Sequence, residues 1–346
     1  MTLYSKAMKH IPLFAQHLSV SSLILIISSL PLQVDAQTRQ PTRQYDLPTN
    51  QIDDYRARQS LLNREKTPSS ISGEIADSDL GIQRPVEEKK TGFGYHLGFE
   101  TKLGYSNNPA SMESTSDTFD SAGVWENSLR NNFLLGAFDL GGASFSPLAS
   151  INFARVNHFG HDDLDILDSD SLSISFAGIF QFNGGWSLRG SLASSFQFDP
   201  NSGMYQTYRE TSPTIALGKG LQIGNAQAFI EWSIAYCYTN SKAQQIEDIM
   251  DRFETALLFG LNMPLGKIEF SPFLRFALSR YSNEDTSYNK EQTDFLVNLG
   301  LQLKYSFSEW LSLKGHLNLT TRNSNISGKD FTRIDPGVGA ALDAKF

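Results

Sequence analysis

The sequence predicts an all-β fold, a transmembrane antiparallel up-and-down β-barrel of about 12 strands preceded by a mostly disordered N-terminal segment. Three observations lead to this prediction. Apolar and polar residues alternate in many segments after residue 92, short and long connections alternate between those segments, and aromatic residues gather at the segment ends. The 346 residues suffice for one large barrel with a short accessory segment.

Composition excludes several classes of protein. Mean hydropathy is negative and only one long apolar run exists, which argues against a helical membrane protein. A net charge of −8 disfavours a nucleic-acid partner, because phosphate binding needs a basic surface. Cys237 is the only cysteine, so an intramolecular disulfide is excluded, and we expect this residue to serve in packing.

Residues 1–36 are expected to form a signal peptide. Lys6 and Lys9 precede the uncharged stretch Leu18–Leu32, and small residues follow at the cleavage positions. We therefore expect cleavage before Gln37. An uncleaved anchor helix is the alternative, although Pro31 weakens a spanning helix.

Residues 37–92 are polar and poor in aromatic residues, so they are predicted to be a disordered periplasmic linker. Ile52, Tyr55 and Leu61 would form a weak apolar stripe on a short helix from about Gln51 to Lys66. Such a helix could dock onto or into the barrel. A tether that folds only transiently is the alternative.

From Phe93 to Phe346 the alternation of apolar and polar residues predicts the outer-membrane β-barrel itself, because successive side chains of a strand face opposite ways. The alternation breaks at Arg130, Asn131 and Asn132, which leaves ten or fourteen strands open beside twelve. The clearest alternating segments, in order, are 93–105, 172–182, 186–198, 228–238, 253–261, 268–278, 295–307, 311–319 and 338–346.

Two kinds of connection alternate along this region. Short ones are expected at 139–142, 183–185, 219–225, 263–266 and 306–309, and longer polar ones at about 106–118, 159–169, 199–204, 240–248, 282–290 and 323–330. Short periplasmic turns and long external loops are typical of outer-membrane barrels. An even number of strands also leaves both termini of the barrel in the periplasm.

A membrane barrel needs an apolar exterior and places its polar side chains inside, the reverse of a soluble barrel. Mixed charges inside leave two outcomes open: they line open water and set weak selectivity, or they pair across a narrow lumen. Interface aromatics are expected at Tyr105, Phe182, Trp186, Phe198, Tyr205, Tyr238, Tyr281, Tyr305, Phe307 and Trp310. The predicted pore-lining residues are Glu100, Lys102, Arg189, Glu231, Arg252, Glu254, Glu269, Arg275, Asp294, Lys304, Lys314 and Arg322, with His316, Glu126 and Arg130 on the same face.

Both ends of the predicted barrel resemble known proteins. Alternating apolar residues from Val338 lead to the terminal Phe346, which looks like the C-terminal signature that the barrel-assembly machinery reads. The stretch Gly104–Pro109 resembles the opening of uncharacterised β-barrel porins, and the strand pattern extends this similarity over about residues 93–346. The resemblance implies a barrel in the bacterial outer membrane, among outer-membrane lipid and lipopolysaccharide. It implies no substrate.

We expect neither catalysis nor a cofactor or metal. His158 and His161 lie near Ser171 in sequence, but the serine and histidine pattern of outer-membrane phospholipases is absent. The acidic run from Asp162 to Asp170 lacks the glycine and glutamate of a calcium loop and reads as a charged loop.

The sequence therefore predicts a porin-like channel for small hydrophilic solutes or saccharides. The alternatives are a structural or envelope-polysaccharide-pathway barrel without an open pore and, last, an outer-membrane hydrolase. The oligomeric state does not follow from the sequence.

Overall fold

The computed structural model describes residues 93–111, 121–160, 162–202, 205–241, 250–285 and 288–346. The predicted signal peptide and linker lie outside these ranges. Within them, no helix is long and apolar enough to cross a membrane. The strands are β1 (Phe93–Ser106), β2 (Ala122–Leu135), β3 (Phe138–Asp139), β4 (Ala143–Phe159), β5 (Ser169–Phe182), β6 (Trp186–Asp199), β7 (Tyr205–Ile223), β8 (Ala226–Ser241), β9 (Arg252–Leu265), β10 (Ile268–Asp285), β11 (Lys290–Ser306), β12 (Leu311–Ser324) and β13 (Phe331–Lys345).

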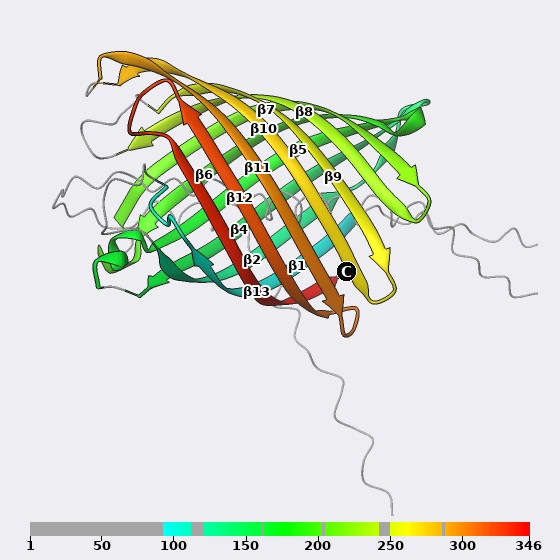
Figure 1. The fold of residues 1–346 in the computed structure, drawn as a ribbon. Helices are drawn as coiled ribbons and strands as arrows, with labels where there is room; N and C mark the ends of the chain where they lie inside the picture. Colours follow the sequence, from blue (N-terminus) through cyan, green and yellow to red (C-terminus); the bar gives the residue numbers. More distant parts are fainter. Residues whose placement is uncertain (1–92, 112–120, 161, 203–204, 242–249, 286–287) are drawn as a thin grey trace, which may run out of the picture. The chain divides into compact units, whose positions relative to one another are not determined.

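The strands close into an antiparallel barrel, which Figure 1 shows with β1 beside β13. Each strand pairs with its neighbours in sequence, and β2 pairs with β4 across the two-residue β3, which also pairs with β4. Twelve strands therefore form the wall, as the sequence predicts. Closure leaves no free sheet edge, which is the condition for a β protein to span lipid.

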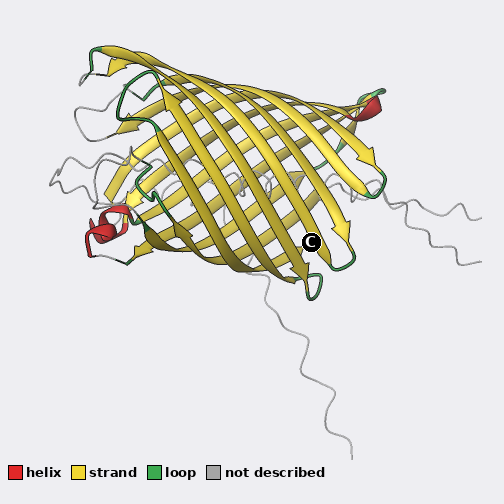
Figure 2. Cartoon of the chain, viewed as in Figure 1, coloured by secondary structure: helices red, strands yellow, loops and turns green. Residues whose placement is uncertain are grey.

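Short turns join the strands at one end of the barrel and longer connections join them at the other (Figure 2). The short turns include the 3-10 turn Asn183–Gly185 and the turns at Gly224 and Gly266, both glycines at positive φ. The longer connections include the 3-10 helix η2 (Asp162–Leu167) and η4 (Pro200–Ser202). The predicted alternation is confirmed, but the turns expected at 219–225 and 263–266 are too long, because β7 and β9 continue to Ile223 and Leu265.

The wall has an apolar exterior and a polar interior. On β11, Leu299 faces outward and is 51% exposed, whereas its neighbour Asn298 faces inward and is 2% exposed. Buried apolar side chains form only small clusters in the described part, such as Leu134 with Leu148 and Ile179. This polarity is the reverse of a soluble barrel and confirms the transmembrane fold class.

The break in the alternation at residues 130–132 does not interrupt β2. Arg130 and Asn132 face inward, and the outward Asn131 accepts a hydrogen bond from the Tyr95 hydroxyl (2.9 Å). Its amide also donates to the backbone carbonyl of Ile151 (3.3 Å). A polar side chain is tolerated on the outer face here because neighbouring groups on β1 and β4 satisfy it.

Most of the predicted interface aromatics that the structure describes face outward, among them Tyr105, Trp186 and Trp310. The prediction is wrong for Tyr281. This side chain faces the interior, is 2% exposed, and donates a hydrogen bond to Asp294 (3.3 Å). Position at a strand end therefore predicts an interface aromatic only when the residue also falls on the outward phase of the strand. The Tyr205 side chain lies outside the described part.

Candidate functional site: the lumen wall

The register places all twelve predicted pore-lining residues on inward positions of their strands. Ion pairs join eleven of them to an opposite charge, and Glu269 lies directly opposite Lys304 in the pairing of β10 with β11. These pairs run along the wall, within one strand, between neighbouring strands or across one intervening strand. Whether the lumen is open or filled stays open, as in the sequence analysis. That these residues line a conducting pore stays a prediction.

The densest group of charges, the Glu100 cluster, lies on β1, β2 and β12. Glu100 is 1% exposed and accepts hydrogen bonds from Lys314 (2.7 Å) and from Arg130. Lys102 lies 3.7 Å from Glu100 and 3.4 Å from Glu126. Three cations thus surround two carboxylates, which compensates charges that would be costly to bury alone.

Several lumen ion pairs join strands that are not adjacent. Lys314 on β12 reaches Glu100 on β1 across β13, where the intervening inward residues are Gly339 and Ala341. A Cβ added to Gly339 would stand 2.6 Å from the carbonyl oxygen of Thr101, so only glycine fits.

The same arrangement recurs across β7 and β8. Arg189 on β6 reaches Glu231 on β8 (2.7 Å) over Ala216 and Gly218 of β7. Further on, Arg252 on β9 reaches Glu210 on β7 (2.9 Å) across β8. Small inward residues on the middle strand let long charged side chains meet above it.

A second part of the wall, on β5 to β8, differs from the charged part. Its inward residues are small and half-buried, and most carry a hydroxyl. Cross-strand neighbours include Ser173 with Ser195 and Ser191 with Thr214. We call this surface the hydroxyl wall; it consists of Ser171, Ser173, Ser175, Ser191, Ala193, Ser195, Ser212, Thr214, Ser233 and Ala235.

Charges occur where the hydroxyl wall ends. Arg189 donates to the Ser191 hydroxyl (3.1 Å), and the Ser212 hydroxyl donates to Glu210 (3.1 Å). The sequence prediction omitted both Glu210 and the hydroxyl wall. The signal was present in the alternate serines of β5 and β6, but serine is neither apolar nor charged, so an analysis of charge alone passes over it.

The structure gives the candidate hydrolase residues other partners. His158 contacts Asp168 through its ring (3.4 Å) and its backbone N–H (2.7 Å), and the Ser171 hydroxyl donates to the carbonyl of Ala154 (3.4 Å). Asp170 of the acidic run pairs with Arg155 (2.6 Å). Among the residues that the structure describes, no three His, Cys, Asp or Glu side chains are grouped to hold a metal.

A closed barrel with an apolar exterior and a charged, hydrogen-bonded interior is a transmembrane β-barrel of the outer-membrane type. This is the fold that the resemblance of both ends implies. No protein-family model matches the chain, and no curated protein is similar to it in sequence.

Solved structures that resemble the chain are outer-membrane barrels. An outer-membrane channel from Pseudomonas putida F1 is 9% identical with a TM-score of 0.44, covering 72% of this chain and 95% of that one. The NanC porin is 12% identical with a TM-score of 0.41, covering 70% and 98%. LpxR from Salmonella typhimurium is 9% identical with a TM-score of 0.38, covering 70% and 99%. Likenesses this distant carry no argument about function.

Proposed function

We propose that this protein is a porin-like channel of the bacterial outer membrane that passes small hydrophilic solutes or saccharides without catalysis. The hydroxyl wall is the observation that supports the proposal. It presents small polar groups at half-buried positions, whereas the Glu100 cluster is almost wholly buried. Solute would therefore pass along β5 to β8, beside charges that are already paired.

The chemistry of the two surfaces favours weakly charged or neutral solutes. Serine and threonine hydroxyls both donate and accept hydrogen bonds, so they can replace water around a sugar hydroxyl without a charge. The paired carboxylates and cations largely cancel each other's field, which gives little selection by sign. Outer-membrane lipid, lipopolysaccharide and the barrel-assembly machinery are the proposed partners, with export through a cleaved signal peptide.

Single-channel recording in planar bilayers tests the proposal. The purified full chain should give discrete conductance steps. Ala193→Trp places a large ring on the hydroxyl wall and should lower the conductance severalfold, while Leu192→Trp, one residue along β6 on the outer face, should leave it unchanged. Folded protein without any steps, or equal conductance of the two variants, would contradict the proposal.

A barrel without an open pore is the second candidate, and the lumen ion pairs are the observation that favours it. Pairs that reach across intervening strands fill space inside the wall. Such a barrel would serve a structural role or an envelope-polysaccharide pathway. Folded wild-type protein that stays silent in bilayers, together with an envelope defect on deletion of the gene, would select this candidate.

A further inference from the structure

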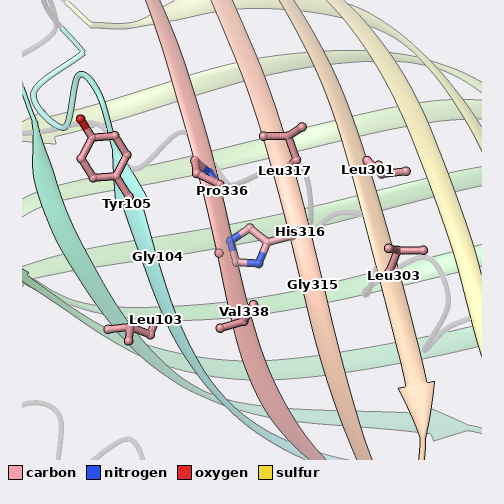
Figure 3. A pocket seen from close by; sticks show the side chains of 11 residues that line it. Leu103, Gly104, Tyr105, Leu301, Leu303, Gly315, His316, Leu317, Pro336 and Val338 are labelled. Atoms are coloured by element: carbon pink, nitrogen blue, oxygen red, sulfur yellow. The ribbon is translucent and has the colours of Figure 1, made fainter.

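A hollow lies on the lipid-facing surface of the barrel, over β11, β12, β13 and β1, and we call it the seam hollow (Figure 3). Its volume is about 570 Å³. Its rim includes the outward aliphatic side chains Leu103, Leu303, Leu317 and Val338, together with Tyr105, and each is about half exposed. The seam hollow is therefore continuous with the apolar outer face of the barrel.

The floor of the seam hollow exists because Gly315 stands on the outward phase of β12. Its cross-strand neighbours on either side are Leu303 of β11 and Val338 of β13. A Cβ added to Gly315 would meet no atom within 4 Å, so the space above this glycine is open. An outward row of leucine and valine is thus interrupted at one position, and a depression one side chain deep results.

Pro336 extends the hollow toward the seam where the barrel closes. The pairing of β1 with β13 ends at Gly104 opposite Gly337, so the next position would set Tyr105 opposite Pro336. Hydrogen-bonded and non-hydrogen-bonded pairs alternate in an antiparallel ladder. Tyr95 and Phe346 form a hydrogen-bonded pair, since each backbone N–H donates to the other's carbonyl. Every second position along β1 repeats this kind of pair, so Tyr105 and Pro336 would also be a hydrogen-bonded pair. Proline has no N–H to give there, and the ladder is interrupted.

The inner face of the wall is closely packed behind this interruption. A Cβ on Gly104 would lie 2.9 Å from the carbonyl oxygen of Pro336, and one on Gly337 would lie 2.5 Å from the His316 ring. Figure 3 shows that ring reaching from β12 toward β13, where it lines the inner side of the hollow. Glycine is therefore required at both inward positions, because the neighbouring backbone and the His316 ring leave no room for a side chain.

We propose that the seam hollow binds one acyl chain of a membrane lipid. The hollow opens on the surface that faces hydrocarbon, and most of its rim is aliphatic. An acyl chain can fill a shallow apolar depression without leaving polar groups unsatisfied. The inference uses the transmembrane fold and does not depend on the channel function.

A second copy of the chain fits the hollow less well. A two-fold axis through the hollow would set Gly315 of one subunit against Gly315 of the other, because both subunits use the same patch. The seam hollow is concave around Gly315, and two copies would enclose a void between them. A flexible chain that adapts to the depression is the better occupant.

Native mass spectrometry of the full chain, released from nanodiscs of a single diacyl phosphatidylethanolamine, tests the proposal. The wild-type barrel should retain one lipid after the others are stripped, and Gly315→Leu, which fills the hollow, should lose it. Gly190→Leu is the matched control, because Gly190 also faces outward with no atom within 4 Å of an added Cβ. It should keep the lipid.

Heat-modifiable gel migration shows whether each variant folds. If Gly315→Leu does not fold, Val338→Trp covers the hollow from its rim and should cause the same loss. Equal lipid retention by the wild type, the filling variant and the control would overturn the proposal. A dimer that disappears in the filling variant would overturn it as well, and would assign the hollow to a second copy.

Discussion

The position of Leu299 on β11 allows the membrane-spanning fold to be tested with one substitution. Outward aromatics flank it, Phe295 four residues before it and Tyr305 six residues after it. At about 3.4 Å per residue and a strand tilt of about 40°, these rings lie about 10 Å and 15 Å from Leu299 along the membrane normal. The two distances add up to about 25 Å, which is the height of the apolar band that barrels expose to lipid. Leu299 therefore lies near the middle of this band.

Leu299→Arg should therefore lower the free energy of unfolding by about 2–4 kcal/mol in phospholipid vesicles, because an arginine on the lipid face near the midplane is poorly solvated. Neither flanking interface is within easy reach of its guanidinium group. In water the same change at a 51% exposed leucine would cost almost nothing. The two environments thus predict clearly different results.

Urea titration of the vesicle-embedded protein, followed by tryptophan fluorescence, measures the change. Tyr288→Arg in the connection between β10 and β11 is the control, since this side chain is exposed to a similar extent and lies outside the strands. It should shift the free energy of unfolding by less than about 0.5 kcal/mol. Leu299→Ala separates the loss of apolar surface from the burial of charge. If the two arginine variants were equally stable, the outer face would not be in hydrocarbon.

Three further substitutions test the interior. Glu100→Gln should destabilise the barrel by about 3–5 kcal/mol in the same titration, because it leaves three buried cations with one carboxylate, whereas Glu291→Gln in an exposed pair should cost less than about 1 kcal/mol. Tyr281→Phe should cost about 1–3 kcal/mol by removing a buried hydrogen bond to a carboxylate, and an unchanged midpoint would contradict that bond. Gly337→Ala should cost about 1–3 kcal/mol because its Cβ enters the neighbouring histidine ring, and Gly190→Ala, with open space, should be near neutral.

The fold could be predicted from the sequence because the signal is local. Whether a residue faces lipid or lumen depends only on the phase of its strand, so the alternation on β11 already separates Leu299 from Asn298. The same reasoning placed all twelve candidate lumen residues on the correct face. It failed at Tyr281, where the position at a strand end was given more weight than the phase.

The contacts within the site could not be predicted, because they depend on register between strands far apart in sequence. Nothing near Lys314 in the sequence indicates Glu100, which lies 214 positions away and two strands around the wall. The seam hollow likewise requires that Gly315 stand beside Val338 while Pro336 interrupts the ladder to β1. Each residue is unremarkable alone, and only the closed register brings them together.

If the barrel is the channel proposed above, its small wall residues link ion pairing to solute passage. Gly218 and Ala216 allow Arg189 to reach Glu231 above β7, and the same strand contributes Thr214 to the hydroxyl wall next to that pair. A larger residue at position 218 would separate the pair and expose both charges to solute. In the proposed channel, conductance, selectivity and stability should therefore change together at such positions, because the small side chains that admit the ion pairs would also leave room for solute.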